Sequence, residues 1–383
     1  MHKMVNKVYE NQKIALRFSK KAIDKAARDI RHNCSIDARN DAIEKIQNFR
    51  EIHLYPLMLI KNHIARTAKK VDEKIIIARR LKRLPTIIDK LERPSLDGES
   101  QNAIKLTRMQ DIGGCRAIVK NIEQLEILKS KLEASRSVHK IISTSDYLTP
   151  KASGYSGVHL VYSCFNNVEE DNNWKKTKIE VQLRTNLQHA WATSLEIIDT
   201  LKQINLKTSL SGHTSWRRFF SIAGKLVAHD EGAALLEPHI VLYYEIELEK
   251  LERELRALGS LTSFGVGIQA TTEHLKKLPK KYKLGMCLVS ISFESLLNPE
   301  IVTTGKKRIN VNVEAFKSEE SQEAIQALNE QEADNNIAIS VLLSASDVTA
   351  LYKAYPNYFG STSDFADFIR KHIKKHRVRT RVI

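Results

Sequence analysis

The stretch that decides the fold is KIEVQLRT, residues 178–185. Apolar and polar residues alternate along it, which is the pattern of a β-strand with one buried face. Its polar side chains, Glu180, Gln182 and Arg184, therefore share the face opposite the core. A row of polar side chains beside a buried core is a candidate functional site.

Further β-type runs surround this strand. We expect strands over 112–119, 138–143, 157–164 and 178–184, and a helix over 121–134. In that helix Asn121 is a plausible N-cap, and Leu125, Leu128 and Leu132 form an apolar stripe that needs a sheet face for burial. The fold class is therefore α+β, with a mixed β-sheet flanked by helices.

The flanking regions divide the chain further. Residues 13–90 have helical character, and 94–100 have the Pro, Ser, Asp and Gly content of a loop. Helices are expected over 186–202 and 232–258, the second with a buried stripe at Leu235, Leu242, Ile246 and Leu255. Beyond 259–267 we expect strands over 286–293, 309–316 and 337–343, and helices over 319–332, 347–355 and 364–373. The predicted domains are thus a helical N-terminal region (1–94), a central region (95–258) and a small α+β domain (260–383).

Composition excludes several classes of protein. The chain has 383 residues, 42% of them hydrophobic and 28% charged, which is the makeup of a globular protein of two or three domains. Its apolar runs stop far short of the roughly 18 residues that span a bilayer, so we expect a cytoplasmic protein without a membrane segment. The four cysteines are scattered and have no zinc-ligand spacing, so they indicate neither a disulfide framework nor a zinc site.

The positive charge is concentrated at the two ends. Residues 1–100 hold 23 Lys and Arg against 13 Asp and Glu, residues 101–369 hold 31 against 32, and residues 370–383 hold seven against none. Clustered cations of this kind suit a polyanionic partner such as a nucleic acid. A solvated basic surface with a frayed tail explains the same charges, and charge alone does not choose between the two.

Residues suited to phosphate chemistry fall into three ordered clusters. Cations can neutralise a triphosphate, an Asp and a Glu on adjacent strands can hold Mg²⁺, and a glycine-bearing loop can let a base approach an aromatic ring. The clusters are Arg80, Lys82, Thr86 and Lys90; Asp111, Gly113 and Arg116; and Lys151, Gly154, Tyr155, His159, Glu180, Gln182, Arg184 and Thr185.

Four strings within these clusters resemble the synthetase domain of the RelA/SpoT family of pyrophosphokinases. They are RLKRLPTIIDK (80–90), DIGGCR (111–116), PKASGYSGVH (150–159) and EVQLRT (180–185). The resemblance covers roughly residues 75–200. It implies transfer of the β,γ-pyrophosphate of ATP to a ribose hydroxyl, which makes (p)ppGpp in most members and modifies the tRNA 3′ CCA end in a toxin branch.

The resemblance also implies roles for individual residues. Asp111 is the expected Mg²⁺ ligand, and Glu180 is either the general base or a second metal contact. Arg80 and Arg116 are expected to sandwich adenine and neutralise phosphate. The further ATP contacts are Lys82, Lys90, Lys151 and Arg184, and the acceptor-binding residues are Tyr155, His159 and Gln182. Downstream, Ile197 stands where many relatives have His, which leaves acceptor handling open.

The motif YKAY places Tyr352 and Tyr355 on one face of an expected helix. Pairs at this spacing usually belong to a core. However, a synthetase followed by a small domain with such a pair resembles the fused toxin and antitoxin members, the capsid-activated CapRel type. That resemblance implies a zinc-finger-like C-terminal domain without metal, a tyrosine pair that plugs the ATP site, and a phage capsid-type protein that binds residues 260–383 and releases the plug.

Three interpretations remain for the chain. The first is a pyrophosphokinase that acts on the 3′ CCA end of tRNA, as a self-inhibited phage-defence toxin, with Mg²⁺ as cofactor. The second is an alarmone synthetase that uses ATP and GDP or GTP, since Tyr155 can stack on guanine equally well. The third is an RNA-binding module with a degenerate synthetase fold, against which the presence of Asp111 and Glu180 argues.

His229 and Asp230 are expected to be a helix N-cap rather than part of a hydrolase. For the oligomeric state, we expect a monomer.

Overall fold

The computed structural model describes residues 10–32, 34–92, 104–166, 172–202, 213–259, 286–298, 312–317, 319–344 and 361–381, with a few isolated residues between these ranges. Tyr352, Tyr355 and the helix expected over 347–355 lie outside the described residues. Among the helices that are described, none is long and apolar enough to cross a bilayer.

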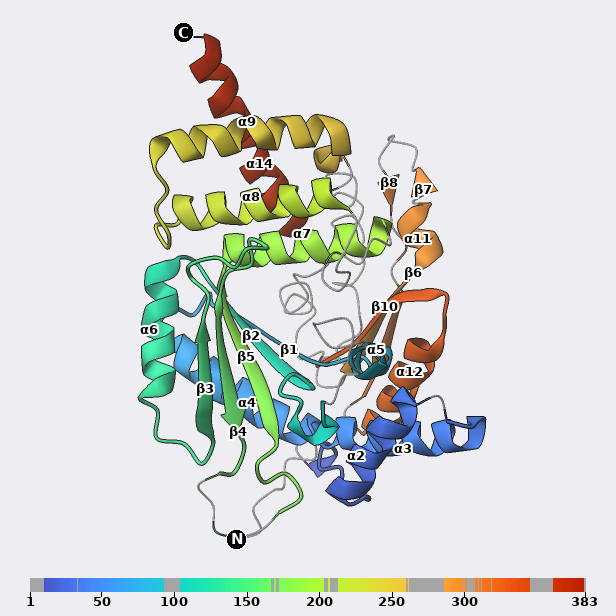
Figure 1. The fold of residues 1–383 in the computed structure, drawn as a ribbon. Helices are drawn as coiled ribbons and strands as arrows, with labels where there is room; N and C mark the ends of the chain where they lie inside the picture. Colours follow the sequence, from blue (N-terminus) through green and yellow to red (C-terminus); the bar gives the residue numbers. More distant parts are fainter. Residues whose placement is uncertain are drawn as a thin grey trace.

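A five-stranded mixed sheet forms the centre of the chain, in the order β1-β2-β5-β4-β3 (Figure 1). The strands are β1 (Ile76–Leu81), β2 (Gly113–Val119), β3 (Lys140–Asp146), β4 (Val158–Ser163) and β5 (Lys178–Thr185). β2 and β5 pair in parallel, and the other neighbours pair antiparallel. The predicted α+β class with a mixed sheet flanked by helices is confirmed.

One face of this sheet is covered by α4 (Leu54–Lys69) and α6 (Ile122–Glu133). Asn121 caps α6 by accepting a hydrogen bond from the backbone N–H of Gln124, as its sequence position predicted. The predicted stripe of Leu125, Leu128 and Leu132 is buried against the apolar side of β2, β4 and β5. Each fully buried leucine contributes about 1.5–3 kcal/mol, so this interface anchors the sheet.

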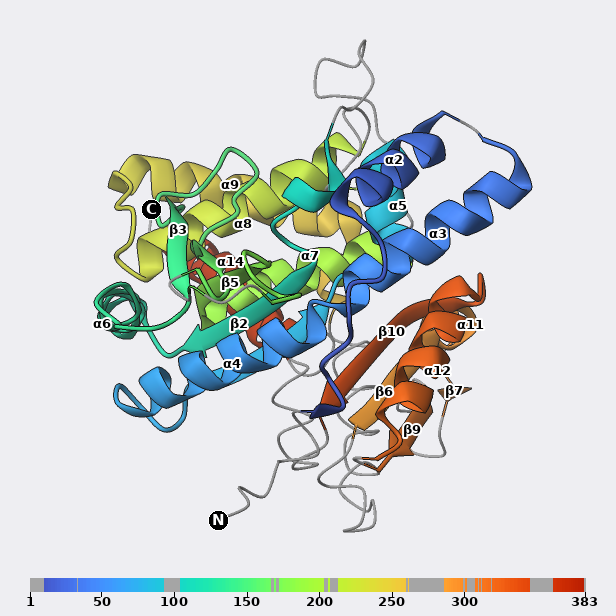
Figure 2. The same cartoon turned by 90° about the horizontal axis from the view of Figure 1, so that it is seen from below.

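The N-terminal helices form a separate small core. α2 (Lys20–Arg31) and α3 (Ile36–Glu51) each begin after a serine, Ser19 or Ser35, whose hydroxyl accepts a backbone N–H of the first turn. They pack with α5 (Leu84–Glu92) (Figure 2). The short 3₁₀ helix η1 (Leu106–Arg108) packs on α2 in the same core. This core holds α5 at the edge of the sheet.

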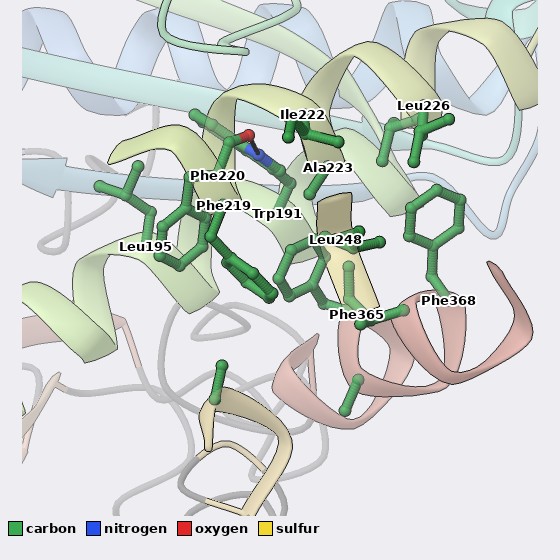
Figure 3. Packing of buried hydrophobic residues seen from close by; sticks show 14 of the residues in the cluster. Trp191, Leu195, Phe219, Phe220, Ile222, Ala223, Leu226, Leu248, Phe365 and Phe368 are labelled. Carbon is green, nitrogen blue, oxygen red and sulfur yellow. Dashed lines mark hydrogen bonds between the residues drawn. The ribbon is translucent and has the colours of Figure 1, made fainter. Parts of the chain in front are cut away.

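A layer of helices lies beyond one end of the sheet. It contains α7 (Asn186–Lys202), α8 (Thr214–Asp230), α9 (Pro238–Leu255) and the C-terminal helix α14 (Ser361–Arg381) (Figure 1). Phe365 of α14 is fully buried and stacks on Phe220 of α8, with ring centroids 5.8 Å apart (Figure 3). The C-terminal helix is therefore part of the core that also supports α7, the helix that follows β5.

Residues 286–344 contribute a second, smaller sheet in the order β10-β6-β9. Its strands are β6 (Met286–Ser292), β9 (Asn312–Phe316) and β10 (Ile337–Ser344), and α12 (Ser321–Ala333) packs on it. α11 (Phe293–Leu297) and the short pair β7 (Glu300–Ile301) and β8 (Lys307–Arg308) complete the described part. The predicted domain boundaries and the zinc-finger-like shape stay predictions.

Two expectations about local structure are wrong. Residues 76–81 were expected to be helical, but they form β1, because the β-branched run around Ile76 and Ile77 pairs with β2. Arg80 therefore lies on a strand rather than on a helix. The stripe predicted for the helix over 232–258 is wrong at two positions: Leu235 lies before α9 and is 80% exposed, and Ile246 is 46% exposed. Leu255 packs against the core, and the buried residues of α9 are Val241, Glu245, Leu248, Glu249 and Leu251.

Phe365→Ala is expected to lower the free energy of unfolding by about 3–5 kcal/mol, because it empties a buried aromatic site between α14 and α8. Urea denaturation followed by tryptophan fluorescence measures the change. Tyr243→Ala is the matched control, since Tyr243 is 54% exposed and its truncation should change stability by only about 0.5 kcal/mol. Equal effects of the two substitutions would show that α14 does not belong to the core.

Candidate functional site

The strand register aligns polar residues across the middle of the sheet. On neighbouring strands Arg80 lies opposite Gly114, and Gly114 lies opposite Glu180. Gly114 has no side chain, so nothing from β2 fills the space between the cation and the carboxylate. Asp111 stands two residues before β2, close to the end of the strand that carries Gly114. The polar face predicted from the sequence is thus assembled by the pairing of β1, β2 and β5.

Asp111 is held by two lysines. The Nζ of Lys82 lies 2.8 Å from its Oδ2, and the Nζ of Lys90 lies 3.0 Å from its Oδ1. Burial by itself would raise the pKa of Asp111, but the two ammonium groups lower it overall. For Lys82, burial outweighs the carboxylate and lowers the pKa. The carboxylate is therefore ionised, and it shares its charge between two cations that are well placed for phosphates.

Glu180 belongs to a chain of hydrogen bonds that ends at a tyrosine. His159 of β4 lies opposite Gln182 of β5. The Nδ1 of His159 is 3.0 Å from Glu180 Oε1. The hydroxyl of Tyr155 bonds the other ring nitrogen of His159. Gln182 Nε2 donates to the second carboxylate oxygen of Glu180 at 2.8 Å. Burial tends to raise the pKa of Glu180, and the bond from His159 is the main reason that it is lowered overall.

The loop that carries Tyr155 depends on glycine. Gly154 has a φ of 88°, and a Cβ there would lie 2.5 Å from the carbonyl oxygen of Phe220 on α8. Ser221 of α8 also donates a hydrogen bond to the carbonyl of Ala152, at 2.7 Å. We expected the glycine to let a base approach an aromatic ring. In the structure it lets the loop approach α8, which fixes the position of Tyr155.

Arginines crowd the same face. Arg184 donates to the Tyr155 hydroxyl at 3.0 Å and to Gln182 Oε1 at 2.8 Å. Burial, and then repulsion from Arg184, lower the pKa of Arg116 to about 9, while Glu196 opposes the shift. Buried cations that repel one another favour an anionic ligand, since such a ligand offsets both the desolvation and the repulsion.

A cavity of about 170 Å³ opens at this face, and both candidate carboxylates line it. Of the predicted residues, its lining includes Arg80, Lys82, Asp111, Arg116, Glu180 and Gln182. Lys90, Tyr155, His159 and Arg184 reach these residues through the bonds described above. Lys151 lies beside them, with its Nζ 3.8 Å from the ring centroid of Tyr147 and 5.8 Å from that of Tyr155. The structure therefore brings the predicted central site residues together.

Two residues that contact the candidate site were not predicted from the sequence. Tyr147 follows β3, and its ring contacts Tyr155 and His159 edge-on, with centroid distances of 6.1 and 5.5 Å. An aromatic residue just after the strand expected over 138–143 was the available signal. Arg50 of α3 also reaches the site, because its Nε donates to the carbonyl of Lys82 at 2.8 Å. Nothing in the local sequence around Arg50 indicates this contact.

A second cavity of about 690 Å³ lies at the end of the sheet where β5 begins. Its lining carries four lysines, which are Lys20, Lys175, Lys176 and Lys178. It contains no acidic residue. It lacks the paired carboxylates of the first cavity, so it suits the binding of an anion rather than acid–base chemistry. Lys178 stands on β5 two residues before Glu180, and the two side chains therefore share a face of the strand.

The donors present fit Mg²⁺ bound together with a nucleotide. Mg²⁺ is commonly held by one or two carboxylates plus substrate phosphates. Asp111 and Glu180 line one cavity and provide such a pair. Within the described residues no group of three or more His, Cys, Asp or Glu side chains forms a self-contained metal cage.

His229 and Asp230 do not form the expected N-cap, because they lie at the C-terminal end of α8. The Nδ1 of His229 accepts a hydrogen bond from the backbone N–H of Leu236. Asp230 pairs with Lys371 and His372 of α14, with oxygen-to-nitrogen distances of 3.1 and 3.3 Å. These contacts help to fasten α14 to α8.

Part of the chain is similar to known proteins. Residues 79–197 match the family model described as the region found in RelA / SpoT proteins. That segment contains all the predicted site residues except Tyr352 and Tyr355. The chain is also 30% identical over 115 residues to the GTP pyrophosphokinase YjbM of Bacillus subtilis (strain 168). This match covers 30% of the chain, and the chain spans about half (51%) of the length of that relative.

Solved structures that are similar to part of this chain include two bacterial examples. Small alarmone synthetase 1 from Bacillus subtilis, bound to pppGpp, is 20% identical, with a TM-score of 0.38 over 54% of this chain and 97% of the other. A GTP pyrophosphokinase family protein from Streptococcus pneumoniae is 24% identical, with a TM-score of 0.33 over 46% of this chain and 83% of the other. The assignment of the reaction therefore depends on the family match and on the geometry of the site, not on these structural likenesses.

Asp111→Asn is expected to weaken the binding of a non-hydrolysable ATP analogue about tenfold when Mg²⁺ is present, because the substitution removes a charged ligand. Without Mg²⁺ the analogue should bind the variant at least as well as it binds the wild type, since Lys82 and Lys90 are then released to the phosphates. Isothermal titration with and without Mg²⁺ measures both quantities. Asp89→Asn, an exposed site on α5, is the control. Unaltered Mg²⁺ dependence in Asp111→Asn would exclude Asp111 as a metal ligand.

Proposed function

We propose that this chain is an ATP-dependent pyrophosphokinase that transfers pyrophosphate from ATP to the 3′ CCA end of tRNA and thereby blocks translation. The observation that carries the proposal is the cavity lined by two carboxylates, Asp111 and Glu180, and by the cations Arg80, Lys82 and Arg116. The family match over residues 79–197 supports the same reaction.

The chemistry follows from the charges in the cavity. Arg80, Lys82, Lys90 and Arg116 neutralise the triphosphate and hold it against β1 and β2. Mg²⁺, when bound with ATP, would be held by Asp111 together with the phosphates and would neutralise further phosphate charge. The acceptor oxygen attacks the β-phosphorus, the bond from that phosphorus to the α-phosphate oxygen breaks, and AMP leaves.

Glu180 is suited to take the proton of the attacking hydroxyl. It is ionised, it is largely buried, and one of its carboxylate oxygens is oriented by His159 and the other by Gln182. The ring of Tyr155 lies at the end of this chain, where an acceptor base can stack on it. Arg184, which donates to the Tyr155 hydroxyl, keeps that ring in place.

The distribution of lysines favours a nucleic-acid acceptor. The second cavity adjoins the start of β5, two residues from Glu180, and four lysines line it. A tRNA strand that ends at Tyr155 and Glu180 would have phosphates for these cations to neutralise, with release of the counterions that the strand carries. The excess positive charge of residues 1–100 and 370–383 supports the same acceptor.

An alarmone synthetase is the second candidate. Its support is the 30% identity to a GTP pyrophosphokinase, together with the ring of Tyr155, which stacks on guanine as readily as on adenine. This alternative uses the same ATP site and the same base, Glu180. It differs only in the acceptor, so one labelling experiment separates the two.

Self-inhibition completes the proposal. The cavity of about 170 Å³ is smaller than the roughly 300–1,000 Å³ of typical ligand pockets, and Lys82 and Lys90 both bond Asp111. These features support a closed resting state. In our proposal Tyr352 and Tyr355 plug the site, and a phage capsid-type protein that binds residues 260–383 favours the open state through its higher affinity for that state.

The full chain carrying both Tyr352→Ala and Tyr355→Ala is expected to transfer label from γ-labelled ATP to deacylated tRNA in the presence of Mg²⁺. GDP and GTP are offered in separate reactions. The full chain is required because α14 belongs to the core, so truncation near residue 260 would expose Phe219 and Phe220. The wild-type chain should transfer at least tenfold less label if the tyrosine pair occupies the ATP site.

Glu180→Gln in this released chain is expected to reduce transfer about 10²–10⁴-fold, as for loss of a general base. Glu126→Gln, on the exposed side of α6, is the matched control and should leave transfer unchanged. Label on GDP or GTP alone would establish the alarmone reaction instead. No transfer to any acceptor would refute the pyrophosphokinase proposal.

His159→Ala is expected to move the acidic limb of the pH profile of kcat/KM to higher pH. The bond from His159 lowers the pKa of Glu180, so its loss lets burial raise that pKa. Since the reaction needs the carboxylate, activity would then be lost at a higher pH as the solution is acidified. His239→Ala, at an exposed histidine of α9, should leave the limb in place. A limb that stays in place or moves to lower pH in His159→Ala would contradict the role of His159.

A further inference from the structure

A buried ion pair joins the N-terminal helices to the C-terminal region beside the candidate ATP site. The Arg50 NH2 group of α3 lies 3.1 Å from the Oε1 of Glu332 on α12, and the two side chains are 1% and 2% exposed. Arg50 NH1 also donates to Asn329 of α12 at 3.1 Å. Burial lowers the pKa of Arg50 and raises that of Glu332, so the pair and its hydrogen bonds must offset a desolvation cost.

Both members of this pair also hold the segment between β1 and α5. Arg50 Nε donates to the carbonyl of Lys82 at 2.8 Å. The backbone N–H of Leu84 donates to Glu332 Oε2 at 3.1 Å. Each carboxylate oxygen of Glu332 therefore has a different partner, one on α3 and one at the start of α5.

Leu84 is the first residue of α5, so its N–H has no acceptor within the helix. A carboxylate at this position satisfies that N–H and interacts favourably with the helix dipole. α5 spans Leu84–Glu92, only nine residues, and a helix of this length is marginal without outside support. α12 packs directly on α5 (Figure 1). Glu332 thus supplies, from a part of the chain distant in sequence, a cap for the first turn of α5.

The capped segment carries the two lysines that bond Asp111. Lys82 stands just before α5 and Lys90 lies in its last turn, and both reach Asp111. Unfolding of this nine-residue helix from its first turn onward would let both ammonium groups move away from the cavity. The geometry of the site therefore depends on a residue that lies outside the segment 79–197 that matches the family.

We propose that Glu332 is a positioning residue for the ATP site: by capping α5 and pairing with Arg50 it presets Lys82 and Lys90 for the phosphates of ATP. This inference rests on the proposed function. It also requires that α12 stays docked while ATP is bound, so any release of the tyrosine plug must leave the contact between α12 and α5 intact.

The test compares variants of the full chain that carries Tyr352→Ala and Tyr355→Ala. Glu332→Gln is expected to weaken binding of Mg²⁺ with a non-hydrolysable ATP analogue roughly tenfold, because the amide cannot neutralise Arg50. In turnover the KM for ATP should rise while the KM for the acceptor stays unchanged. Hydrogen exchange of the backbone amides of residues 84–92 should be faster in the variant.

Two further variants separate positioning from general damage. Glu330→Gln makes the same chemical change at an exposed position of α12 and should bind the analogue as the parent does. Glu332→Asp keeps the charge and should recover part of the lost affinity. Parent-like or tighter binding by Glu332→Gln, or unchanged exchange of residues 84–92, would overturn the role of Glu332 alone. Failure of every protein, the parent included, to bind the analogue would overturn the proposed ATP site as well.

Discussion

The parallel pairing of β2 with β5 is the constraint on which the site depends. Its register sets Gly114 beside Glu180 and Arg116 beside Gln182, and the antiparallel neighbours then add Arg80 and His159 to the same face. A slip of one residue in this pairing would turn the polar side chains of one of the two strands into the apolar core. The leucine stripe of α6 and the covering face of α4 prevent such a slip, because they bury only the opposite set of side chains.

Two C-terminal elements support this sheet from outside it. α14 inserts Phe365 into the core beneath α8, and α8 in turn holds the Tyr155 loop through its close approach to Gly154. α12 reaches the opposite edge, where Glu332 meets Arg50 and the first turn of α5. The stability of the candidate site and that of the C-terminal region are thus coupled through packing at two separate places, and a partner that moves either element would alter the site.

Much of the central region could be predicted because its signals are local. Alternation in residues 178–185, the leucine period of α6 and its Asn121 cap each depend on neighbours in sequence, and the structure confirms them. The failures have non-local causes. β1 becomes a strand because β2 is available to pair with it, and the buried face of α9 is set by α8 and α14. Arg50 and Glu332 are 282 residues apart, so no sequence pattern links them.

The central claim is that Mg²⁺ and ATP bind in the cavity between β1, β2 and β5. The most direct measurement is an experimental structure of the full chain, carrying both tyrosine-to-alanine substitutions, with Mg²⁺ and a non-hydrolysable ATP analogue. The account predicts phosphates within hydrogen-bond distance of Lys82 and Arg116, with Asp111 facing the metal rather than both lysines. An analogue bound elsewhere, with the Asp111 ion pairs intact and the cavity empty, would contradict it.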